Sequence, residues 1–185
     1  MDTNTYESHL EYHYSKFWGP QVSHSIWSRG PGLAQTCNIY EYPPTQETNY
    51  WVYATSGMTP FREPILIELF LVSPQQTEIH IELLTVIADY HQSEAYIGLG
   101  DTVNFGRPWM PWSKCEFGLI SLPYTYGPLL EQVHILKWEV QVLWLIPITR
   151  EERDFKATSG LEALEERFEK KQFNYMDPLR ASVAP

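Results

Sequence analysis

Glu68 is the residue whose surroundings most invite chemistry. It stands in the middle of the apolar run Ile65 to Val72, where an ionised carboxylate without partners would be strongly destabilising. Burial of this kind either shifts the pKa of an acid or requires a partner for it. We expect Arg62 or a cluster of backbone groups to supply that partner, and we favour a structural hydrogen-bonding role for Glu68 over a catalytic one.

Two histidines, His9 and His13, lie one helical turn apart, which is a zinc-ligand spacing. The glutamate between them does not directly follow the first histidine, as the metalloprotease motif requires, so we interpret the two as a surface pair. The other candidate histidines are His80, His91 and His134. None has an acid or a nucleophile at a spacing typical of a catalytic motif, so we expect them to be structural or exposed. We therefore predict no catalytic residues, no metal site and no cofactor.

Two glycine-containing segments resemble catalytic motifs only superficially. Gly98-Leu99-Gly100 follows a predicted helix and precedes a strand, which reverses the order that dinucleotide binding requires. Ser56 is followed by Gly57, but Ala54 occupies the position of the first glycine of a hydrolase G-x-S-x-G turn. We interpret the second segment as a tight turn.

The segment from residue 107 to residue 112 is the best candidate for contact with a partner. It contains residue types that are enriched at binding hot spots, and two prolines hold it extended. The candidate partner-binding residues are Arg107, Trp109, Met110 and Trp112. In the alternative interpretation, both indoles fold back onto the sheet as a lid.

The composition favours a protein partner. The chain has a formal net charge of −10, which argues against nucleic-acid binding, because that depends on clustered Lys and Arg. Seven Trp, twelve Tyr and eight Phe supply unusual ring area for a core or an interface. Two cysteines are too few for a disulfide framework. We see no leader and no stretch long enough to cross a membrane, so we expect a cytoplasmic protein.

The elements that position these residues follow from periodicity. A helical stripe runs from Tyr6 to Phe17, and a second helix runs from Thr77, a plausible N-cap, to His91. The stretch after it reads as a loop as far as residue 112. Strands are predicted at His24 to Ser28, Thr36 to Tyr42, Asn49 to Thr55, Ile65 to Val72, Glu116 to Leu122, and Val133 to Ile148. The last run is long enough that we expect a bulge or break to divide it.

Near the C-terminus, two segments have the spacing of a capping box. One begins at Thr149 and the other at Ser159, and each is predicted to open a helix. We expect the tail from Asn174 onwards to be loosely attached.

In order and spacing, these elements resemble the Suppressor of fused family. The resemblance rests on the run Asn49 to Thr59, on the strand and helix that follow it, and on three later segments. The residues that carry it, with an expected structural role, are Thr55, Ser56, Gly57, Met58, Glu68, Gly100, Asp101, Pro147, Thr149 and Glu152. The match spans about residues 37–170. We predict a single domain over residues 1–173, with an N-terminal helix at 5–18 and a tail at 174–185.

The resemblance implies an α/β (α+β) fold in which a mixed, largely antiparallel sheet is flanked by helices. It also implies binding rather than catalysis, because the animal member of the family sequesters a transcription factor. Bacterial members that stand alone resemble immunity proteins, which bind and neutralise a toxin domain, so the expected partner is a protein, possibly a basic toxin domain. We expect a monomer or weak homodimer. The alternatives are an intracellular regulatory scaffold, or an enzyme that uses Glu68 and a histidine.

Overall fold

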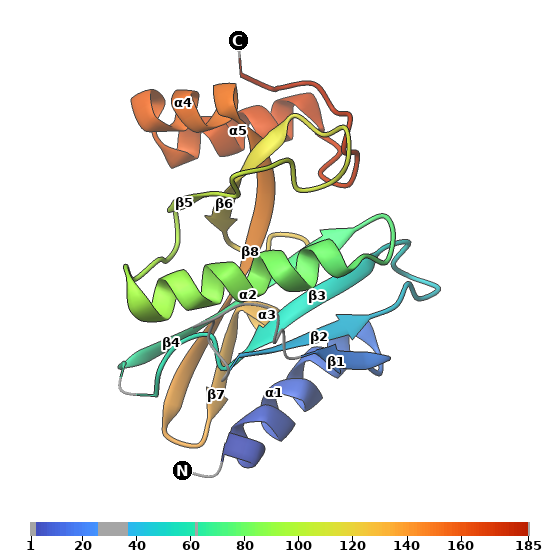
Figure 1. Cartoon of the computed structure of the whole chain (residues 1–185), viewed down its shortest axis with the longest axis vertical. Helices are drawn as coiled ribbons and strands as arrows, with labels where there is room; N and C mark the ends of the chain where they lie inside the picture. The colour runs from blue at the N-terminus through green and yellow to red at the C-terminus, as the bar shows by residue number, and fades with distance from the viewer. Residues whose placement is uncertain (1–2, 26–36, 62, 185) are drawn as a thin grey trace. The chain divides into compact units, whose positions relative to one another are not determined.

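The computed structural model describes residues 3–25, 37–61 and 63–184. The chain divides into two compact units (Figure 1). Unit 1 comprises residues 1–99 and 122–144, and unit 2 comprises residues 100–121 and 145–185. The sequence predicted one domain over residues 1–173, and that remains a prediction. Within the described residues we find no helix that could span a lipid bilayer.

Unit 1 is built on a sheet in the order β1, β2, β3, β4 and β8, and β7 pairs with β8. Neighbouring strands are antiparallel except β4 and β8, which are parallel. This mixed, largely antiparallel sheet with flanking helices confirms the predicted fold class. Its elements are α1 (Thr3–Trp18), β1 (Ser23–Ser25), β2 (Asn38–Tyr42), β3 (Trp51–Ser56), β4 (Ile65–Ser73), α2 (Glu78–Ser93), α3 (Pro128–Glu131), β7 (Gln132–Ile135) and β8 (Trp138–Thr149), which ends in unit 2.

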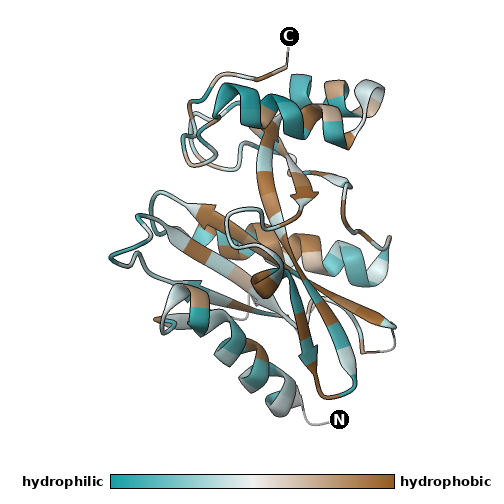
Figure 2. Cartoon of the chain, turned by 180° about the vertical axis from the view of Figure 1, so that it is seen from behind, coloured by the Kyte–Doolittle hydropathy of each residue, from teal (hydrophilic) through white to brown (hydrophobic). Residues whose placement is uncertain are grey.

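Helices cover both faces of β4. The Phe70 ring packs on Trp18 of α1, with ring centroids 5.3 Å apart. The next residue, Leu71, lies opposite Tyr53 of β3, and the Tyr53 ring packs on His80 of α2 at 5.2 Å. Successive side chains of a strand point to opposite faces, so α1 and α2 lie on opposite faces of the sheet, as the two opposite views in Figures 1 and 2 show.

The core is apolar on both faces of this strand, as its sequence predicted. Every residue of β4 after Ile65 is buried, whereas Ile65 itself is 43% exposed. The hydropathy colouring of Figure 2 shows the central strands as mostly hydrophobic and the helices α4 and α5 as mostly hydrophilic. Much of the aromatic content of unit 1 gathers around the buried Trp18 indole, whose ring neighbours are Tyr14, Tyr42, Phe70 and Tyr126.

The long apolar run after residue 132 is divided, as predicted. It forms the hairpin β7–β8, in which Ile135 pairs with Trp138 around a two-residue turn. Leu136 occupies that turn with a φ of 58°, a left-handed conformation that favours glycine. Two short elements were not predicted, namely α3 and the strand β5 (Thr102–Asn104), which lies in the stretch interpreted as loop.

Unit 2 joins β5, β6 (Cys115–Ser121) and the end of β8 to two helices, α4 (Arg150–Ser159) and α5 (Leu161–Lys171). Thr149 caps α4 with the predicted capping box. The second predicted capping box is wrong, because Ser159 is the last residue of α4. The cap of α5 is Gly160, which has a φ of 92° and provides no side-chain hydrogen bond.

The expected loose attachment of the tail is also wrong. Arg180 is only 7% exposed, and its guanidinium donates to both carboxylate oxygens of the buried Glu152, at 2.6 and 2.7 Å. It donates in addition to the carbonyl oxygen of Pro147 at 2.9 Å. The backbone N–H of Val183 completes the set with a 2.9 Å bond to Glu152. Such bidentate, charge-assisted bonds hold the tail against the start of α4.

We expect Arg180→Met to lower the free energy of unfolding by about 3–5 kcal/mol, because removing one partner leaves Glu152 charged and buried. Urea denaturation monitored by tryptophan fluorescence measures this loss. Lys171→Met is the matched control, since Lys171 is exposed, and it should change the stability by no more than about 0.5 kcal/mol. Equal effects of the two substitutions would contradict the role assigned to Arg180.

Candidate functional site

Glu68 lies at the centre of the candidate site in unit 1. Its side chain is fully buried, and its carboxylate accepts four hydrogen bonds. Tyr6 Oη and Gly57 N donate to Oε1, each at 2.7 Å. Thr55 Oγ1 and Met58 N donate to Oε2, at 2.6 and 3.2 Å. Of the two partners predicted for Glu68, the backbone cluster is therefore present, and Arg62 lies outside the described residues.

The tight turn after β3 places the backbone donors. Gly57 has a φ of 86°, a conformation that glycine adopts at little cost. The chain therefore reverses so that the consecutive N–H groups of Gly57 and Met58 point at one carboxylate, an arrangement typical of anion-binding turns. Tyr6 reaches the same carboxylate from α1. Glu68 thus joins a helix, a turn and two strands.

The environment determines the protonation of Glu68. Burial raises the pKa of the Glu68 carboxyl above its usual value, and the four hydrogen bonds only partly oppose that shift. Burial and then the neighbouring Glu68 raise the pKa of Tyr6 well above its usual value. Because protein donors occupy the carboxylate and solvent does not reach it, the arrangement is suited to holding the turn rather than to exchanging protons with a substrate.

The end of α2 holds the same turn from its other side. Gln92 Nε2 donates to the carbonyl oxygens of Gly57 and Met58, at 3.2 and 3.0 Å. His91 Nε2 lies 3.0 Å from Thr59 Oγ1. The N–H groups of residues 57 and 58 are therefore bound to Glu68, while their carbonyl groups are bound to α2.

His91 is held as a neutral ring with a defined tautomer. The backbone N–H of Ile97 donates to Nδ1 at 3.1 Å, so the ring proton resides on Nε2 and is donated to Thr59 Oγ1. The Thr59 hydroxyl donates in turn to the carbonyl oxygen of Ile67 at 2.9 Å. Burial lowers the pKa of His91, which the charge of Glu63 only partly opposes. Both ring nitrogens are occupied, so His91 is placed as a structural group.

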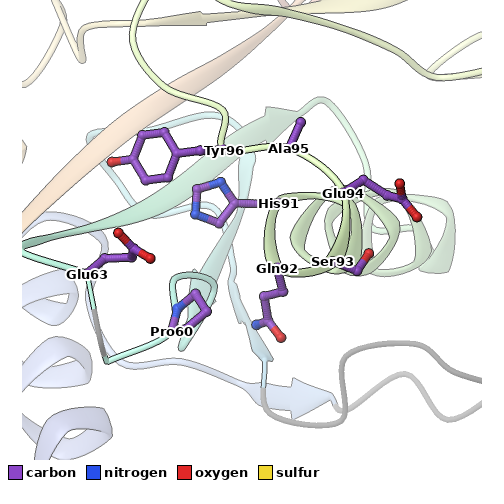
Figure 3. A pocket seen from close by; sticks show the side chains of 8 residues that line it. All are labelled: Pro60, Glu63, His91, Gln92, Ser93, Glu94, Ala95 and Tyr96. Atoms are coloured by element: carbon purple, nitrogen blue, oxygen red, sulfur yellow. The ribbon is translucent and has the colours of Figure 1, made fainter.

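A pocket of about 240 Å³ lies beside this turn, at the end of α2 (Figure 3). Pro60 and Glu63 line it from the segment before β4, and His91 and Tyr96 line it from the end of α2 and the residues that follow. The structure therefore places the pocket next to the hydrogen-bonded turn, and not at Glu68 itself.

The structure does not bring Glu68 and a histidine together as an acid–base pair, because its four hydrogen-bond donors include no imidazole. His13 is 7% exposed and bonds the carbonyl oxygen of Leu130, so the predicted surface pair with His9 is wrong for one of its members. Ser56 is fully buried. In the part of the chain that the structure describes, no cluster of three metal-binding side chains is found.

The candidate partner-binding loop lies in unit 2 and divides into buried and exposed residues. Trp109 and Met110 are 1% and 4% exposed, so neither is available for direct contact in this conformation. Trp112 is 88% exposed, and Arg107 is also exposed. One indole of the two is thus buried, so the alternative in which both fold back onto the sheet does not hold, and the candidates for direct contact with a partner narrow to Arg107 and Trp112.

The residues that carry the family resemblance fall into separate clusters. Thr55, Gly57 and Met58 surround Glu68, as described above. In unit 2, Gly100 N and Asp101 O bond the backbone of Ile120 in β6, at 2.8 and 2.9 Å. The remaining residues surround the Arg180 guanidinium and cap α4: Pro147, Thr149 and Glu152.

Sequence reasoning missed the side chains that reach these clusters from far away. Tyr6 and Glu68 are 62 residues apart, and Glu152 and Arg180 are 28 apart. Tyr6 was visible only as a member of a helical stripe, and Arg180 only as a charge in a tail. For Tyr6 the one signal was Glu68, an acid in an apolar strand that predicts a partner without identifying it, and no comparable signal pointed to Arg180.

Comparisons with known proteins agree with the fold. The family model of the Suppressor of fused protein matches residues 34–181. No curated protein sequence matches the chain significantly. Among solved structures, a Suppressor of fused homologue from Neisseria gonorrhoeae superposes with a TM-score of 0.84 and 35% sequence identity, with 97% of each chain covered.

Two further solved structures share the fold at low sequence identity. A chain of a Sufu–Fu complex superposes with a TM-score of 0.69 and 13% identity, over 97% of this chain and 92% of that one. The Drosophila Suppressor of Fused gives a TM-score of 0.65 and 14% identity, over 95% of this chain and 50% of that one. The chain thus corresponds to about half of the Drosophila protein.

We expect Tyr6→Phe to lower the free energy of unfolding by about 1.5–3 kcal/mol near neutral pH, because a charge-assisted hydrogen bond to a buried carboxylate is lost. The raised pKa of Glu68 sets the sign of the pH dependence. As the pH falls toward the usual carboxyl pKa of 4.5, folded Glu68 takes up a proton before the unfolded chain does. The bond from Tyr6 then has a neutral acceptor, and the loss becomes smaller.

Urea denaturation of both proteins at about pH 8 and about pH 5 tests this expectation. Tyr12→Phe is the control, because Tyr12 lies on the same helix and is 66% exposed. A loss that does not depend on pH, or one no larger than that of Tyr12→Phe, would show that the Tyr6 hydroxyl does not stabilise a charged Glu68.

Proposed function

The chain belongs to the Suppressor of fused family, and from that premise we propose that it is a protein-binding domain. More specifically, we propose that it acts in the cytoplasm as an immunity protein that binds and neutralises a toxin domain. The bacterial homologue at 35% identity supports a role in bacteria. The Sufu–Fu complex supports protein binding by this fold, although at 13% identity that similarity concerns the fold alone.

This proposal depends on one observation, the exposure of the Trp112 side chain. Its side chain is 88% exposed, although tryptophan is among the residues most enriched at the centre of binding interfaces. Its backbone has a φ of 69°, which is unfavourable for a bulky side chain. Strain of this kind persists only where surrounding structure imposes it, and it gathers at functional sites.

The loop around Trp112 is anchored by the residues on either side of it. Trp109 Nε1 donates to Ser113 Oγ at 3.0 Å, and the N–H of Cys115 donates to the same oxygen at 3.0 Å. The N–H of Ser113 donates to the carbonyl oxygen of Met110 at 3.1 Å. These contacts hold the backbone on both sides of Trp112, which would reduce the entropy lost on binding.

The charge of the chain favours a basic partner. The formal net charge is −10, and an acidic surface accelerates encounter with a basic domain and helps to set the orientation of the complex. A toxin domain that acts on nucleic acid would present Lys and Arg to bind phosphates. The charge therefore favours a basic toxin domain as the partner. The exposure of Trp112, and not the charge, is the reason for proposing the loop that carries Arg107 and Trp112 as a contact.

Co-expression tests the proposal directly. The protein should restore growth to cells that express the toxin domain encoded beside it, and the two purified proteins should form a stable complex. A complex with an endogenous regulatory protein, without any rescue of growth, would favour a regulatory scaffold instead. Turnover of a small substrate by the purified chain, lost on Glu68→Gln, would contradict a binding function.

We expect Trp112→Gly to weaken the complex by about 2 kcal/mol or more, as truncation of a hot-spot residue does. The same change should leave the free energy of unfolding unchanged or raise it by about 1 kcal/mol, because glycine tolerates the positive φ. Calorimetric titration and urea denaturation measure the two effects separately. Leu179→Ala is the control, since Leu179 is also an exposed apolar residue of unit 2, at 67%. Unchanged affinity of Trp112→Gly would exclude Trp112 from the interface.

A further inference from the structure

We propose that Pro111 is a positioning residue. It presets a tight turn from which Trp112 projects as a single side chain, and a protein partner receives that side chain in a concave apolar pocket. This inference deepens the proposed function, on which it rests, by assigning the residue that places Trp112 and the kind of surface that fits it. The whole turn belongs to unit 2.

The turn that carries Trp112 has a defined type. The N–H of Ser113 donates to the carbonyl oxygen of Met110 at 3.1 Å, so residues 110–113 form a hydrogen-bonded β-turn. Trp112, the third residue of this turn, has a φ of 69°. A positive φ at the third residue occurs in turns of type II and type I′, and type I′ also needs a positive φ at the second residue. Pro111 occupies that second position, and the proline ring holds φ at about −65°, so the turn is of type II.

Tryptophan is an unusual residue at the third position of a type II turn. Glycine or asparagine is common there, because a positive φ is unfavourable for a residue with a bulky side chain. Of the two central residues, only Pro111 favours the turn, since its φ is already the one that the second position requires. Pro111 is exposed, so its contribution is to the conformation of the backbone rather than to a core. Pro111 therefore opposes the strain that Trp112 introduces.

The ends of the turn are buried and its tip is not. Met110 and Ser113 are 4% and 7% exposed, whereas Trp112 is 88% exposed. Among residues 105–115, Trp112 is the one large hydrophobic side chain that is exposed. An indole with so much accessible surface touches little of its own protein. The loop therefore offers one projecting ring and not a flat apolar patch.

A projecting ring predicts the shape of the surface that receives it. A flat surface covers one face of an indole, whereas a concave pocket covers both faces and the edge. The free energy gained by apolar burial is proportional to the area removed from water, so a concave apolar pocket gains the most from Trp112. The indole N–H needs an acceptor once it is buried. The expected partner surface is thus an apolar pocket with one hydrogen-bond acceptor inside it.

Amide exchange of the full chain, without any partner, tests the role of Pro111. Pro111→Gly should make the N–H of Ser113 exchange about fivefold faster or more, because glycine gives the open loop many more conformations than proline does. The N–H of Ile120, which bonds the carbonyl oxygen of Asp101 at 2.9 Å, should keep its exchange rate, which shows that unit 2 remains folded. Pro74→Gly is the matched control, since Pro74 is also exposed but lies in unit 1. If Pro111→Gly accelerates Ser113 no more than Pro74→Gly does, Pro111 does not preset the turn.

β-Cyclodextrin, whose apolar cavity can enclose an indole, tests whether Trp112 projects. Added to the ¹⁵N-labelled full chain, it should produce saturable shifts of the Trp112 indole N–H signal, with the weak affinity of a single contact. Leu179→Ala should leave this binding unchanged, because Leu179 is the other exposed large hydrophobic residue among the described residues of unit 2. Absence of a shift at Trp112 would show that the ring is not free to enter a pocket.

In the complex with the toxin domain, the effect of Pro111 should pass through Trp112. Pro111→Gly should weaken the complex about threefold or more in the unaltered chain, because a less ordered turn loses more entropy on binding. In the Trp112→Gly background the same change should weaken it by less than about twofold, because no indole remains to be positioned. Equal losses in the two backgrounds would mean that Pro111 acts independently of Trp112, and would overturn the positioning role.

The pocket itself is tested with the chain labelled by 5-fluorotryptophan. The ¹⁹F signal of Trp112, assigned by its loss in Trp112→Phe, should differ between H₂O and D₂O in the free chain, because the ring is exposed. This difference should disappear in the complex if a pocket encloses the ring. A difference that persists in a fully formed complex would place Trp112 on a flat or open surface and contradict the pocket.

These outcomes can be separated from that of the proposed function. If growth is not rescued and no complex forms, the toxin partner is wrong, while amide exchange and β-cyclodextrin still decide whether Pro111 presets the turn and whether Trp112 projects. If Trp112→Gly weakens the complex but Pro111→Gly changes neither the exchange of Ser113 nor the affinity, the proposed function stands and this inference is wrong.

Discussion

A buried carboxylate is the constraint on which unit 1 depends. Glu68 lies inside an apolar strand, and placing its charge there is unfavourable unless donors surround it. The structure meets this requirement with two hydroxyl groups and two backbone N–H groups. Because the donors come from α1, from the end of β3 and from the following turn, these elements must all be in place together. One acid thereby couples the packing of a helix to the geometry of a turn.

The same turn connects the core to the surface. Gly57 and Met58 use their N–H groups for Glu68 and their carbonyl groups for Gln92 at the end of α2. His91 continues the connection through Thr59 to the backbone of β4. Hydrogen bonds therefore hold the side chains of His91 and Gln92 against this turn.

Each unit contains one buried glutamate, and the two glutamates have different kinds of partner. In unit 1 the buried Glu68 carboxyl is surrounded by hydrogen-bond donors, and burial raises its pKa although these bonds partly oppose the shift. In unit 2 the buried Glu152 is paired with the Arg180 guanidinium, which also bonds Pro147 and draws the tail against α4. The hydrogen bonds to Glu68 hold a turn in place, and the Glu152–Arg180 pair holds the C-terminal tail against α4. The exposed Trp112 lies in a loop of unit 2 between the buried Met110 and Ser113, and its φ is positive.

The sequence by itself determined the features that depend on local spacing. The N-terminal helix, predicted at 5–18, the buried strand β4, the Thr149 capping box and the division of the run after residue 132 all follow from periodicity and from short-range hydrogen bonding. It also showed that Glu68 needs a partner. Only the tertiary structure decided which partner, because Tyr6 and Arg180 reach their acids across long stretches of chain. It also decided that Trp109 is buried while Trp112 is exposed, since burial depends on what packs above a residue and not on residue type.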